Sequence, residues 1–497
     1  MQTAIKHKKL AAKTKQFLDA PQRMLVNNQW VNSLSGKTFE TVNPANGVII
    51  AKIPFAEEAD VNAAVSAARN AFKTTWKEGI PPAERADLLW KLAELMERDL
   101  QVFVELETLD NGKPLSKAKY DVIGAIKHLK YYAGWATKIT GSTVPVGSDK
   151  LVYTKKEPLG VVGLIVPWNF PLMITLWKLA PALACGNCCV LKPAEQTPLT
   201  ALYLGHLIVE AGFPPGVVNM VTGFGNPTGA ALTHHMDVDK VSFTGSTAVG
   251  KKILEAAAQS NLKKVSLELG GKSPNVIFED ADLEQVLENL HWSSFYNTGQ
   301  ECTLGSRIYV QASLFEKTVA TLKQKAENMS LGDGFNDLDL GPMISEKQLN
   351  TVLDYIALGE KEGAVLVCGG KRSDGKLEQG YFLQPTIFTT QNEDIRIVQE
   401  ELFGPVVVIS SFTDFEDAVK KANGTPYGLA AAVWTKDVSK AHRFANQVDA
   451  GTVWVNGYDL FDAAVPFGGF KQSGNGKEMG RNAIDLYTKE KAVWIVL

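Results

Sequence analysis

GVVGLIVPW at residues 160–168 opens the part of the chain that decides the fold. Four more apolar runs follow, and segments of helical periodicity separate each run from the next. The four runs are NCCVLKP (187–193), GVVNMVTG (216–223), KVSFTG (240–245) and KKVSLELGG (263–271). Apolar strands that alternate with helices are typical of a parallel sheet covered on both faces. The sequence therefore predicts an α/β fold that binds ligands at the carboxyl ends of its strands.

The composition is that of an ordinary globular protein with two or three domains. The chain has 497 residues, 45% of them hydrophobic, and a formal net charge of −3. This charge does not favour nucleic-acid binding, which calls for a basic surface. Cys185, Cys188 and Cys189 form a CxxCC cluster, but no histidine lies near it, so we expect buried core thiols and no metal site.

The N-terminus shows no apolar segment of a secretory signal. Residues 1–18 carry five lysines, no acid and no arginine, which favours a solvated, frayed leader over a transit peptide. The apolar stretch 159–191 contains Pro167, Lys178 and Pro181, so we read it as protein core and expect no membrane association. A cytoplasmic location is the resulting expectation.

Two glycine-containing segments bear on a phosphate-containing ligand. Gly223, Gly225 and Gly229 give GxGxxxG, one residue longer than the ordinary dinucleotide fingerprint. GSTAVGK (245–251) resembles a P-loop, but Lys252 stands where Ser or Thr would bind magnesium. A pyrophosphate site at a helix N-terminus, with backbone N–H groups near Gly245 and Ser246, fits better.

Lys192 and Glu195 follow the strand NCCVLKP and are candidates for contacts with ribose hydroxyl groups. A carboxylate near the 2′ position would repel the extra phosphate of NADP, so NAD is the predicted cofactor. The alternative is that both residues are exposed loop charges.

Cys302 is the candidate nucleophile, within NTGQECTLGSR (297–307). Gly299 and Gly305 flank it and would let a substrate approach the backbone closely. Judged on this local sequence alone, an inert buried cysteine is the stronger interpretation.

Seven motifs together change that balance. LELGGKSP (267–274) followed by GQEC (299–302) resembles the paired signature of the aldehyde dehydrogenase superfamily. The other five match in order and spacing: PWNFP (167–171), LKPAEQTP (191–198), FTGS (243–246), EELFGPV (400–406) and PFGGFKQSG (466–474). The resemblance covers the chain from about residue 22 onward.

The resemblance implies a role for three catalytic residues. Cys302 matches the thiol that attacks the aldehyde, and Asn169 matches the side-chain donor of the oxyanion hole. Glu268 matches the base that activates water to hydrolyse the thioester, and a glutamate here fits hydrolysis rather than transfer to coenzyme A. It further implies an NAD site whose residues are Val166, Trp168, Lys192, Glu195, Gly225, Gly229, Phe243, Gly245, Ser246, Val249, Leu269, Gly270, Glu401 and Phe403.

The substrate tunnel implied by the resemblance is largely aromatic, which suits an apolar or aromatic aldehyde. Its residues are Phe170, Trp177, Phe295, Glu301, Thr303, Phe461 and Phe467. Residues 153–178 and 451–480, including Asp462, are similar to bacterial phenylacetaldehyde dehydrogenases. The absence of Arg and Lys in the ten residues before Cys302 argues against a carboxylated substrate.

Two residues depart from the family pattern. Glu301 stands where many relatives carry a small residue, and its carboxylate would favour a cationic amino aldehyde and raise the pKa of the thiol. Thr351 replaces a lysine near the cofactor ribose, so we expect looser NAD binding.

The resemblance also implies a division of the chain. Residues 1–140 and 161–270 are expected to form a Rossmann-like NAD-binding domain, and residues 271–470 a second α/β, catalytic domain. Residues 141–160 and 484–497 are expected to form a small β extension for oligomerisation, as a homotetramer or homodimer.

Three hypotheses follow: an aromatic aldehyde dehydrogenase, the same chemistry on aliphatic or amino aldehydes, and a non-catalytic structural protein. The joint presence of Cys302, Glu268 and Asn169 argues against the third.

Overall fold

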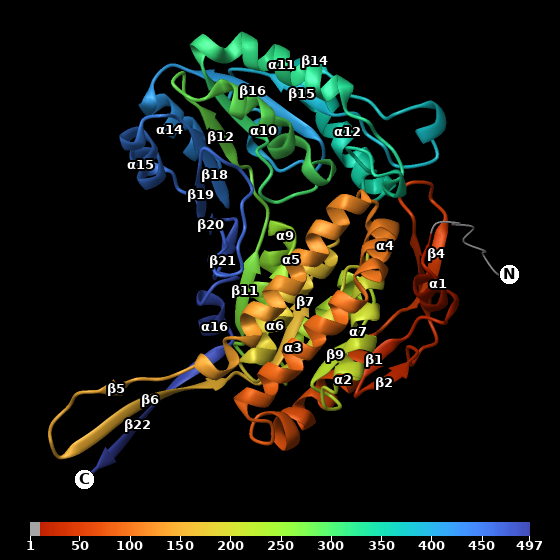
Figure 1. Cartoon of the computed structure of the whole chain (residues 1–497), viewed down its shortest axis with the longest axis vertical. Coiled ribbons are helices and arrows are strands. Elements are labelled where there is room, and N and C mark those ends of the chain that lie inside the picture. The colour runs from red at the N-terminus through yellow and green to blue at the C-terminus, as the bar shows by residue number, and fades with distance from the viewer. Residues whose placement is uncertain (1–9) are drawn as a thin grey trace.

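The computed structural model describes residues 10–497 and contains two large sheets and a projecting arm (Figure 1). The first sheet has eight strands in the order β2-β1-β9-β8-β7-β10-β11-β21. Its five central strands are parallel, whereas the two at one edge and the one at the other are antiparallel. The five apolar runs of the sequence supply these central strands, which confirms the predicted parallel sheet. The strands are β1 (Met24–Val26), β2 (Gln29–Val31), β7 (Val161–Ile165), β8 (Cys188–Lys192), β9 (Val218–Met220), β10 (Lys240–Thr244), β11 (Lys264–Glu268) and β21 (Gly474–Asn475).

Four helices, α2, α6, α7 and α9, pack directly on strands of the first sheet, and α3, α4 and α5 form an outer layer on α6 and α7. The helices are α2 (Glu58–Ala71), α3 (Pro82–Arg98), α4 (Leu100–Asn111), α5 (Leu115–Ala133), α6 (Pro171–Ala184), α7 (Leu199–Ala211), α8 (Ala230–His234), α9 (Thr247–Gln259) and α16 (Asn482–Leu486).

The second sheet has seven strands in the order β14-β15-β16-β13-β12-β18-β19, and all but β14 run parallel to their neighbours. Its strands are β12 (Pro274–Ile277), β13 (Arg307–Gln311), β14 (Val365–Cys368), β15 (Thr386–Thr389), β16 (Val406–Phe412), β18 (Ala430–Trp434) and β19 (Thr452–Val455). Its helices are α10 (Leu283–Phe295), α11 (Phe315–Asn328), α12 (Glu346–Lys361), α13 (Arg396–Gln399), α14 (Phe415–Asn423) and α15 (Val438–Gln447). There are also two small two-stranded antiparallel sheets. One pairs β3 (Thr38–Val42) with β4 (Ile49–Pro54), and the other pairs β17 (Tyr427–Gly428) with β20 (Phe470–Lys471).

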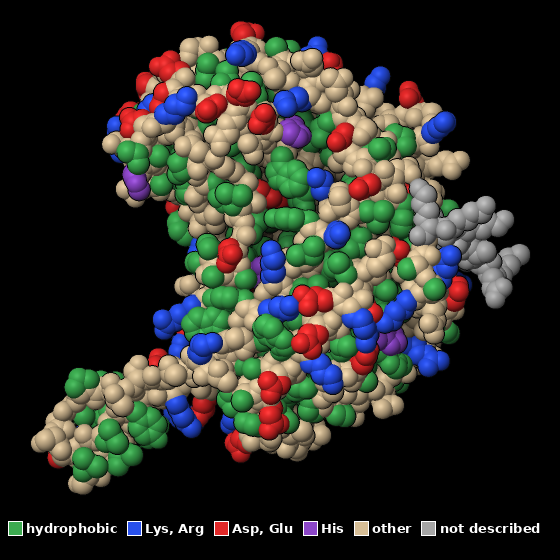
Figure 2. All heavy atoms as spheres, in the orientation of Figure 1, with side chains coloured by type: hydrophobic (Ala, Val, Ile, Leu, Met, Phe, Trp, Pro, Cys, Tyr) green, Lys and Arg blue, Asp and Glu red, His purple; other side chains and the backbone are tan. Residues whose placement is uncertain are grey.

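The arm is a three-stranded antiparallel sheet that projects from the body (Figure 1). The chain-ending strand β22 (Thr488–Val496) pairs along its length with β6 (Lys150–Pro158), and β5 (Thr143–Val144) pairs with the other edge of β6. Hydrophobic side chains gather at its far end (Figure 2), where Trp494 is 62% exposed.

The prediction of a solvated, frayed leader over residues 1–18 is wrong for the second half of that segment. Residues 12–19 form helix α1 (Ala12–Asp19), which buries Thr14 and Phe17. The Thr14 hydroxyl donates to the Glu105 carboxylate at 2.5 Å, and the Phe17 ring meets Tyr203 edge-on at 5.2 Å. Residues 1–9, the other half of that segment, lie outside the described residues.

The cysteine cluster lies between α6 and β8, where the sequence placed a helix–strand junction, and all three of its thiols are buried. Within residues 10–497, none of the helices is both long and apolar enough to cross a bilayer.

Candidate active site

Cys302 follows a tightly constrained turn that closes α10. Asn297, Thr298 and Gly299 all have left-handed backbone, with φ of 47°, 57° and 67°. This conformation costs a non-glycine residue roughly 1–2 kcal/mol, so neighbouring contacts must hold it. The Thr298 hydroxyl donates to the carbonyl of Gly341 at 3.0 Å, and the Asn297 amide donates to the backbone of the opposite loop. The position of the thiol is therefore fixed by its surroundings.

Two glycines let the end of β11 reach this turn. A Cβ at Gly271 would lie 2.2 Å from the carbonyl oxygen of Cys302, and one at Gly270 would lie 2.1 Å from the carboxylate of Glu401. Real Cβ atoms cannot approach so closely, so the GG of LELGGKSP is required by packing. The contact brings the segment after Glu268 against the candidate nucleophile.

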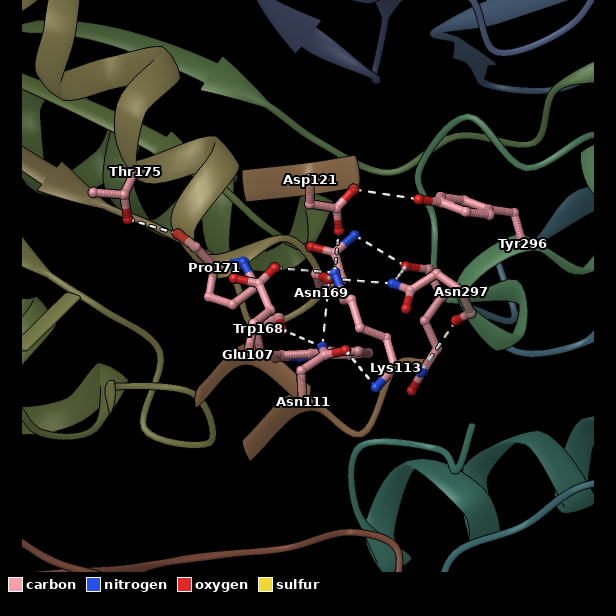
Figure 3. Close-up of polar contacts among 11 residues, drawn as sticks. Glu107, Asn111, Lys113, Asp121, Trp168, Asn169, Pro171, Thr175, Tyr296 and Asn297 are labelled. Atoms are coloured by element: carbon pink, nitrogen blue, oxygen red, sulfur yellow. Dashed lines mark hydrogen bonds and ion pairs between the residues drawn. The ribbon is translucent and has the colours of Figure 1, made fainter. Parts of the chain in front are cut away.

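Asn169 lies opposite the turn, on the loop between β7 and α6 (Figure 3). Its backbone carbonyl accepts hydrogen bonds from Lys113 Nζ at 2.8 Å, Asn297 Nδ2 at 3.1 Å and Asn111 Nδ2 at 3.4 Å. Its side-chain Nδ2 donates to the carbonyl of Gln300 at 3.0 Å. An amide nitrogen carries two protons, so one N–H remains for a developing oxyanion beside Cys302.

Lys113 anchors this loop and was missed by the sequence analysis. It is buried, and its ammonium bonds Asp121 at 2.5 Å and Glu107 at 3.2 Å, besides Asn169 (Figure 3). The Tyr296 hydroxyl donates to Asp121 at 3.2 Å and so ties the nucleophile loop to the same cluster. These residues are far apart in sequence: Lys113 lies between α4 and α5, Glu107 on α4, Asp121 on α5 and Tyr296 directly after α10. No pattern along the sequence marks them as partners.

Glu268 ends β11 and is buried, with its side-chain Oε2 unpartnered. Burial raises the pKa of its carboxyl well above the usual range, and the nearby charge of Glu478 adds to that shift. Lys178 and Lys477 oppose it, as does the N–H of Gly469. Glu478 itself pairs with Lys178 at a buried site. The raised pKa makes the ionised Glu268 a stronger proton acceptor than an ordinary carboxylate, which suits a general base.

The Cys302 thiol lies in an acidic environment. Burial raises its pKa well above the ordinary thiol value, and carboxylates of Glu301, Glu401, Glu268 and Asp459 raise it further. Glu268 is thus one of the carboxylates whose charge acts on the Cys302 thiol, as is required if the two residues belong to one active site. The thiol needs help to ionise, and the site must supply it when substrate is present.

A cavity of about 220 Å³ opens on Cys302. Of the predicted tunnel residues, Phe170, Trp177, Glu301, Thr303, Phe461 and Phe467 line it. Phe295 does not: it is fully buried in the core of the second sheet, and the next residue, Tyr296, faces the cavity instead. The reason is that helix α10 ends at Phe295, so its side chain still points into the helix packing.

The polar part of the cavity comes from residues that are distant in sequence. Asp459, beside Glu301, accepts from the Thr303 hydroxyl at 3.1 Å, and burial raises its pKa to about 6. Tyr120, Lys127, His128 and Asp462 also line the cavity. Lys127 brings a cation to the cavity although the ten residues before Cys302 contain none, because this lysine comes from α5.

The predicted cofactor residues cluster at the carboxyl edge of the first sheet. Lys192 ends β8 and is buried, and its ammonium donates to the carbonyl of Pro193 at 2.9 Å and lies 3.8 Å from Glu195. An ammonium has three protons, so donors remain for ribose hydroxyls. Ser246 caps α9, whose first N–H groups point outward at the positive end of the helix dipole. These groups fit a dinucleotide.

The remaining cofactor candidates surround this edge. The rings of Trp168 and Phe403 meet edge-on at 5.1 Å, and the Glu401 carboxylate accepts from the N–H of Gly271 at 3.0 Å. Burial raises the pKa of Glu401 to about 7. Val166, Gly225, Gly229, Phe243, Gly245, Val249, Leu269 and Gly270 follow or flank the carboxyl ends of β7, β9, β10 and β11. Thr351, on α12, donates only to the preceding turn at 2.9 Å, to Lys347.

Comparison with known proteins places the chain in a family. Residues 30–493 match the model of the aldehyde dehydrogenase family. An aldehyde dehydrogenase of Emericella nidulans is 50% identical over 476 residues, covering 96% of this chain and 95% of that protein. Aldehyde dehydrogenase 1A1 of Gallus gallus is 52% identical, covering 95% of this chain and 93% of that protein.

Solved structures agree. The NAD⁺ complex of aldehyde dehydrogenase from Bacillus cereus superposes with a TM-score of 0.97 at 49% identity, covering 98% of this chain and 99% of that one. Betaine aldehyde dehydrogenase from Staphylococcus aureus, in complex with NAD⁺, gives 0.95 at 38% identity, covering 97% and 96%.

Proposed function

Because this chain belongs to the aldehyde dehydrogenase family and is an oxidoreductase acting on aldehydes, we propose that it oxidises aromatic aldehydes, such as phenylacetaldehyde, with NAD. The observation that carries the proposal is the aromatic cavity that opens on Cys302. Trp177, Phe461 and Phe467 contact one another there, with ring centroids 5.5–6.0 Å apart. Such a wall binds a flat apolar ring well.

In the proposed reaction the Cys302 thiolate attacks the aldehyde carbon. The free N–H of Asn169 and the backbone N–H of Cys302 receive the developing oxyanion, and losing one such donor typically costs about 10²–10³ in rate. The contacts of Lys113, Asn297 and Asn111 with the Asn169 carbonyl support this role, because they fix the loop before substrate binds. Hydride acceptance is the chemistry that NAD would supply when bound, and Cys302 would then carry the acyl group as a thioester.

Glu268 then takes a proton from water, and the resulting hydroxide cleaves the thioester to the carboxylic acid. Its burial and its neighbour Glu478 support this role, since both raise the pKa of the carboxyl and so make the carboxylate a stronger base.

For NAD, we propose that Lys192 and Glu195 hold the adenine ribose and that the N-terminus of α9 holds the pyrophosphate. Glu401 and Phe403 would hold the nicotinamide ribose. The carboxylate of Glu195 favours NAD over NADP, and the lack of a lysine at Thr351 weakens binding.

Variants of the two central residues test the mechanism. Cys302→Ala is expected to abolish NADH production from phenylacetaldehyde, and retained turnover would refute the nucleophile. Glu268→Gln is expected to keep a stoichiometric burst of NADH while steady turnover falls about 10²–10⁴-fold. Loss of the burst would contradict a purely hydrolytic role.

A panel of kcat/KM values tests the substrate class. Phenylacetaldehyde, a short alkanal, an amino aldehyde and succinate semialdehyde are compared under identical conditions. The proposal predicts the highest value for phenylacetaldehyde and the lowest for the semialdehyde. A higher kcat/KM for the alkanal would contradict the aromatic substrate class and would leave the proposed mechanism unaffected.

The acidic side of the cavity favours a second candidate, an amino aldehyde. Glu301 is buried, Asp459 beside it is half-buried, and neither has a lysine or arginine bonded to it among the described residues. A protonated amine would find a carboxylate partner there. A betaine-aldehyde-like substrate in the panel decides between the two.

The arm supports a proposal about assembly and domain organisation. We propose a homotetramer or homodimer joined through residues 141–160 and 484–497. Residues 1–140 and 161–270 would form the NAD-binding domain and residues 271–470 the catalytic domain. We also propose a cytoplasmic location, which the five free cysteines of the described residues favour.

A further inference from the structure

A buried lysine outside the proposed mechanism lies behind Glu268. Lys240 begins β10, is 1% exposed and has no carboxylate bonded to it directly. An isolated buried ammonium is costly unless another charge compensates for it. The negative charge that compensates for the Lys240 ammonium lies farther away and is connected to it through hydroxyl groups.

Four side chains form a continuous chain of hydrogen bonds. Lys240 Nζ donates to Ser266 Oγ at 2.7 Å, and Ser266 Oγ donates to Ser242 Oγ at 3.2 Å. Ser242 Oγ donates to Glu478 Oε1 at 3.1 Å. Each hydroxyl has one proton, so each serine accepts from the lysine side and donates toward the carboxylate, and each hydroxyl proton is used once. We name this the Lys240–Glu478 chain.

The chain ends close to the base, because Glu478 pairs with Phe467 and a Cβ at the next residue, Gly468, would lie 2.6 Å from Glu268 Oε1. Glu478 also pairs with Lys178, which in turn donates to Ser242 at 3.2 Å. The second oxygen of Glu478 and the Oε2 of Glu268 are both buried without a partner, and the charge of Glu478 raises the pKa of Glu268. The two carboxyl groups and the two lysines therefore form one buried electrostatic unit.

Charge balance within this unit depends on Lys240. With Glu268 and Glu478 ionised, Lys178 and Lys240 supply two fully buried positive charges, and the partly exposed Lys477 adds a third near Glu268. If Lys240 were neutral or absent, Lys178 would be the one fully buried ammonium left beside the two carboxylates, and Glu268 would keep its proton more tightly.

We propose that Lys240 is a positioning residue for the base: through Ser266, Ser242 and Glu478, its positive charge keeps Glu268 able to ionise and so to activate water. The inference rests on the assignment of Glu268 as the base.

The groups that face Lys240 are consistent with this role. From β11, Lys264 repels it; from α6, Lys178 does the same; and near the C-terminus Glu478 attracts it. The Tyr487 ring lies 5.1 Å from its ammonium. Burial, the largest cause, lowers the pKa of Lys240 to about 7, so its charge is sensitive to small changes near neutrality.

The test measures thioester hydrolysis without NAD. p-Nitrophenyl acetate acylates Cys302 in a burst of nitrophenolate, and the slow phase that follows reports hydrolysis of the acetyl thioester. The rate of the slow phase is measured against pH for the wild type, Lys240→Met, Lys240→Arg and Ser242→Ala. Lys263→Met is the matched control, because Lys263 is also buried but bonds a backbone carbonyl and Ser260 outside the chain.

Lys240→Met is expected to move the acidic limb of the profile up by about one pH unit, an effect typical of one lost charge near a buried carboxyl, and to slow hydrolysis about tenfold below it. Lys240→Arg keeps the charge and is expected to restore the wild-type midpoint. Ser242→Ala is expected to shift it in the same direction as Lys240→Met, by less.

A Lys240→Met protein with a normal burst and a midpoint equal to those of the wild type and Lys263→Met would overturn the inference. If Lys240→Met does not fold, Ser242→Ala decides: an unchanged midpoint there also overturns it. Failure of the base assignment is separately visible, because Glu268→Gln would then leave the slow phase and its profile unchanged.

Discussion

At the scale of single residues, Glu301 is the side chain that most clearly works against the nucleophile. Burial is the largest cause of the raised pKa of Cys302, and Glu301 is the next. Since only the thiolate attacks a carbonyl, a raised pKa lowers the reactive fraction at neutral pH, and reactivity should rise as the pH rises toward that pKa. The residue before the nucleophile therefore sets part of its chemistry.

Glu301→Gln is expected to lower the pKa of Cys302, because it removes a negative charge while keeping the shape of the side chain. A fall of one unit increases the thiolate fraction about tenfold below the pKa. The rate of alkylation of Cys302 by iodoacetamide, followed against pH, measures this. Asp462→Asn is the control, since Asp462 lines the same cavity without being among the groups that raise the pKa of the thiol. Equal rates for Glu301→Gln and the wild type would contradict the argument.

At the scale of elements, helix α1 shows how a polar-looking segment can be part of the core. AKTKQFLD has two lysines and few apolar residues, and its periodicity is weak. Two side-chain hydrogen bonds hold the helix: Thr14 donates to Glu105, and Lys13 donates to Asp99. Both acceptors come from the region of α3 and α4. Its stability comes from these partners rather than from its own sequence.

Phe17→Ala is expected to destabilise the protein by about 3 kcal/mol, because it removes a buried ring that packs against Tyr203. Chemical denaturation followed by circular dichroism measures the change in the free energy of unfolding. Lys15→Ala, on the exposed face of the same helix, is expected to change it by less than about 0.5 kcal/mol. If both variants matched the wild type, α1 would not be docked as described.

At the scale of the whole molecule, the arm exposes several large apolar side chains to solvent. Its far end exposes Leu151, Trp494, Ile495 and Val496, whereas most apolar side chains of the body are buried (Figure 2). Contiguous exposed apolar surface of this kind marks an interaction site, and β22 also offers an open strand edge.

Trp494→Glu is expected to shift the protein toward smaller species, because it places a charge at the centre of the proposed contact. Light scattering after size-exclusion chromatography measures the mass. Lys489→Glu, an exposed charge change on the same strand, serves as the control. An unchanged mass for Trp494→Glu would exclude the end of the arm as the assembly surface.

The sequence by itself determined the parallel sheet and the family. The five apolar runs between residues 159 and 271 are local patterns, and hydrophobic periodicity is sufficient to predict strands and helices from them. LELGGKSP and GQEC, taken with five further motifs, predict Glu268 and Cys302 as catalytic residues through the family resemblance, whereas the residues around Cys302 alone would not.

Only the tertiary structure decided which distant side chains complete the site. Lys113, Asp121 and Asp459 come from segments with no local signal, and their roles depend on burial and on partners far away in the chain. The same holds for Phe295 and Tyr296, where the end of one helix determines which ring reaches the cavity. Hydrogen bonds and charge effects across such distances exist only after the chain has folded, so no pattern along the sequence could have predicted them.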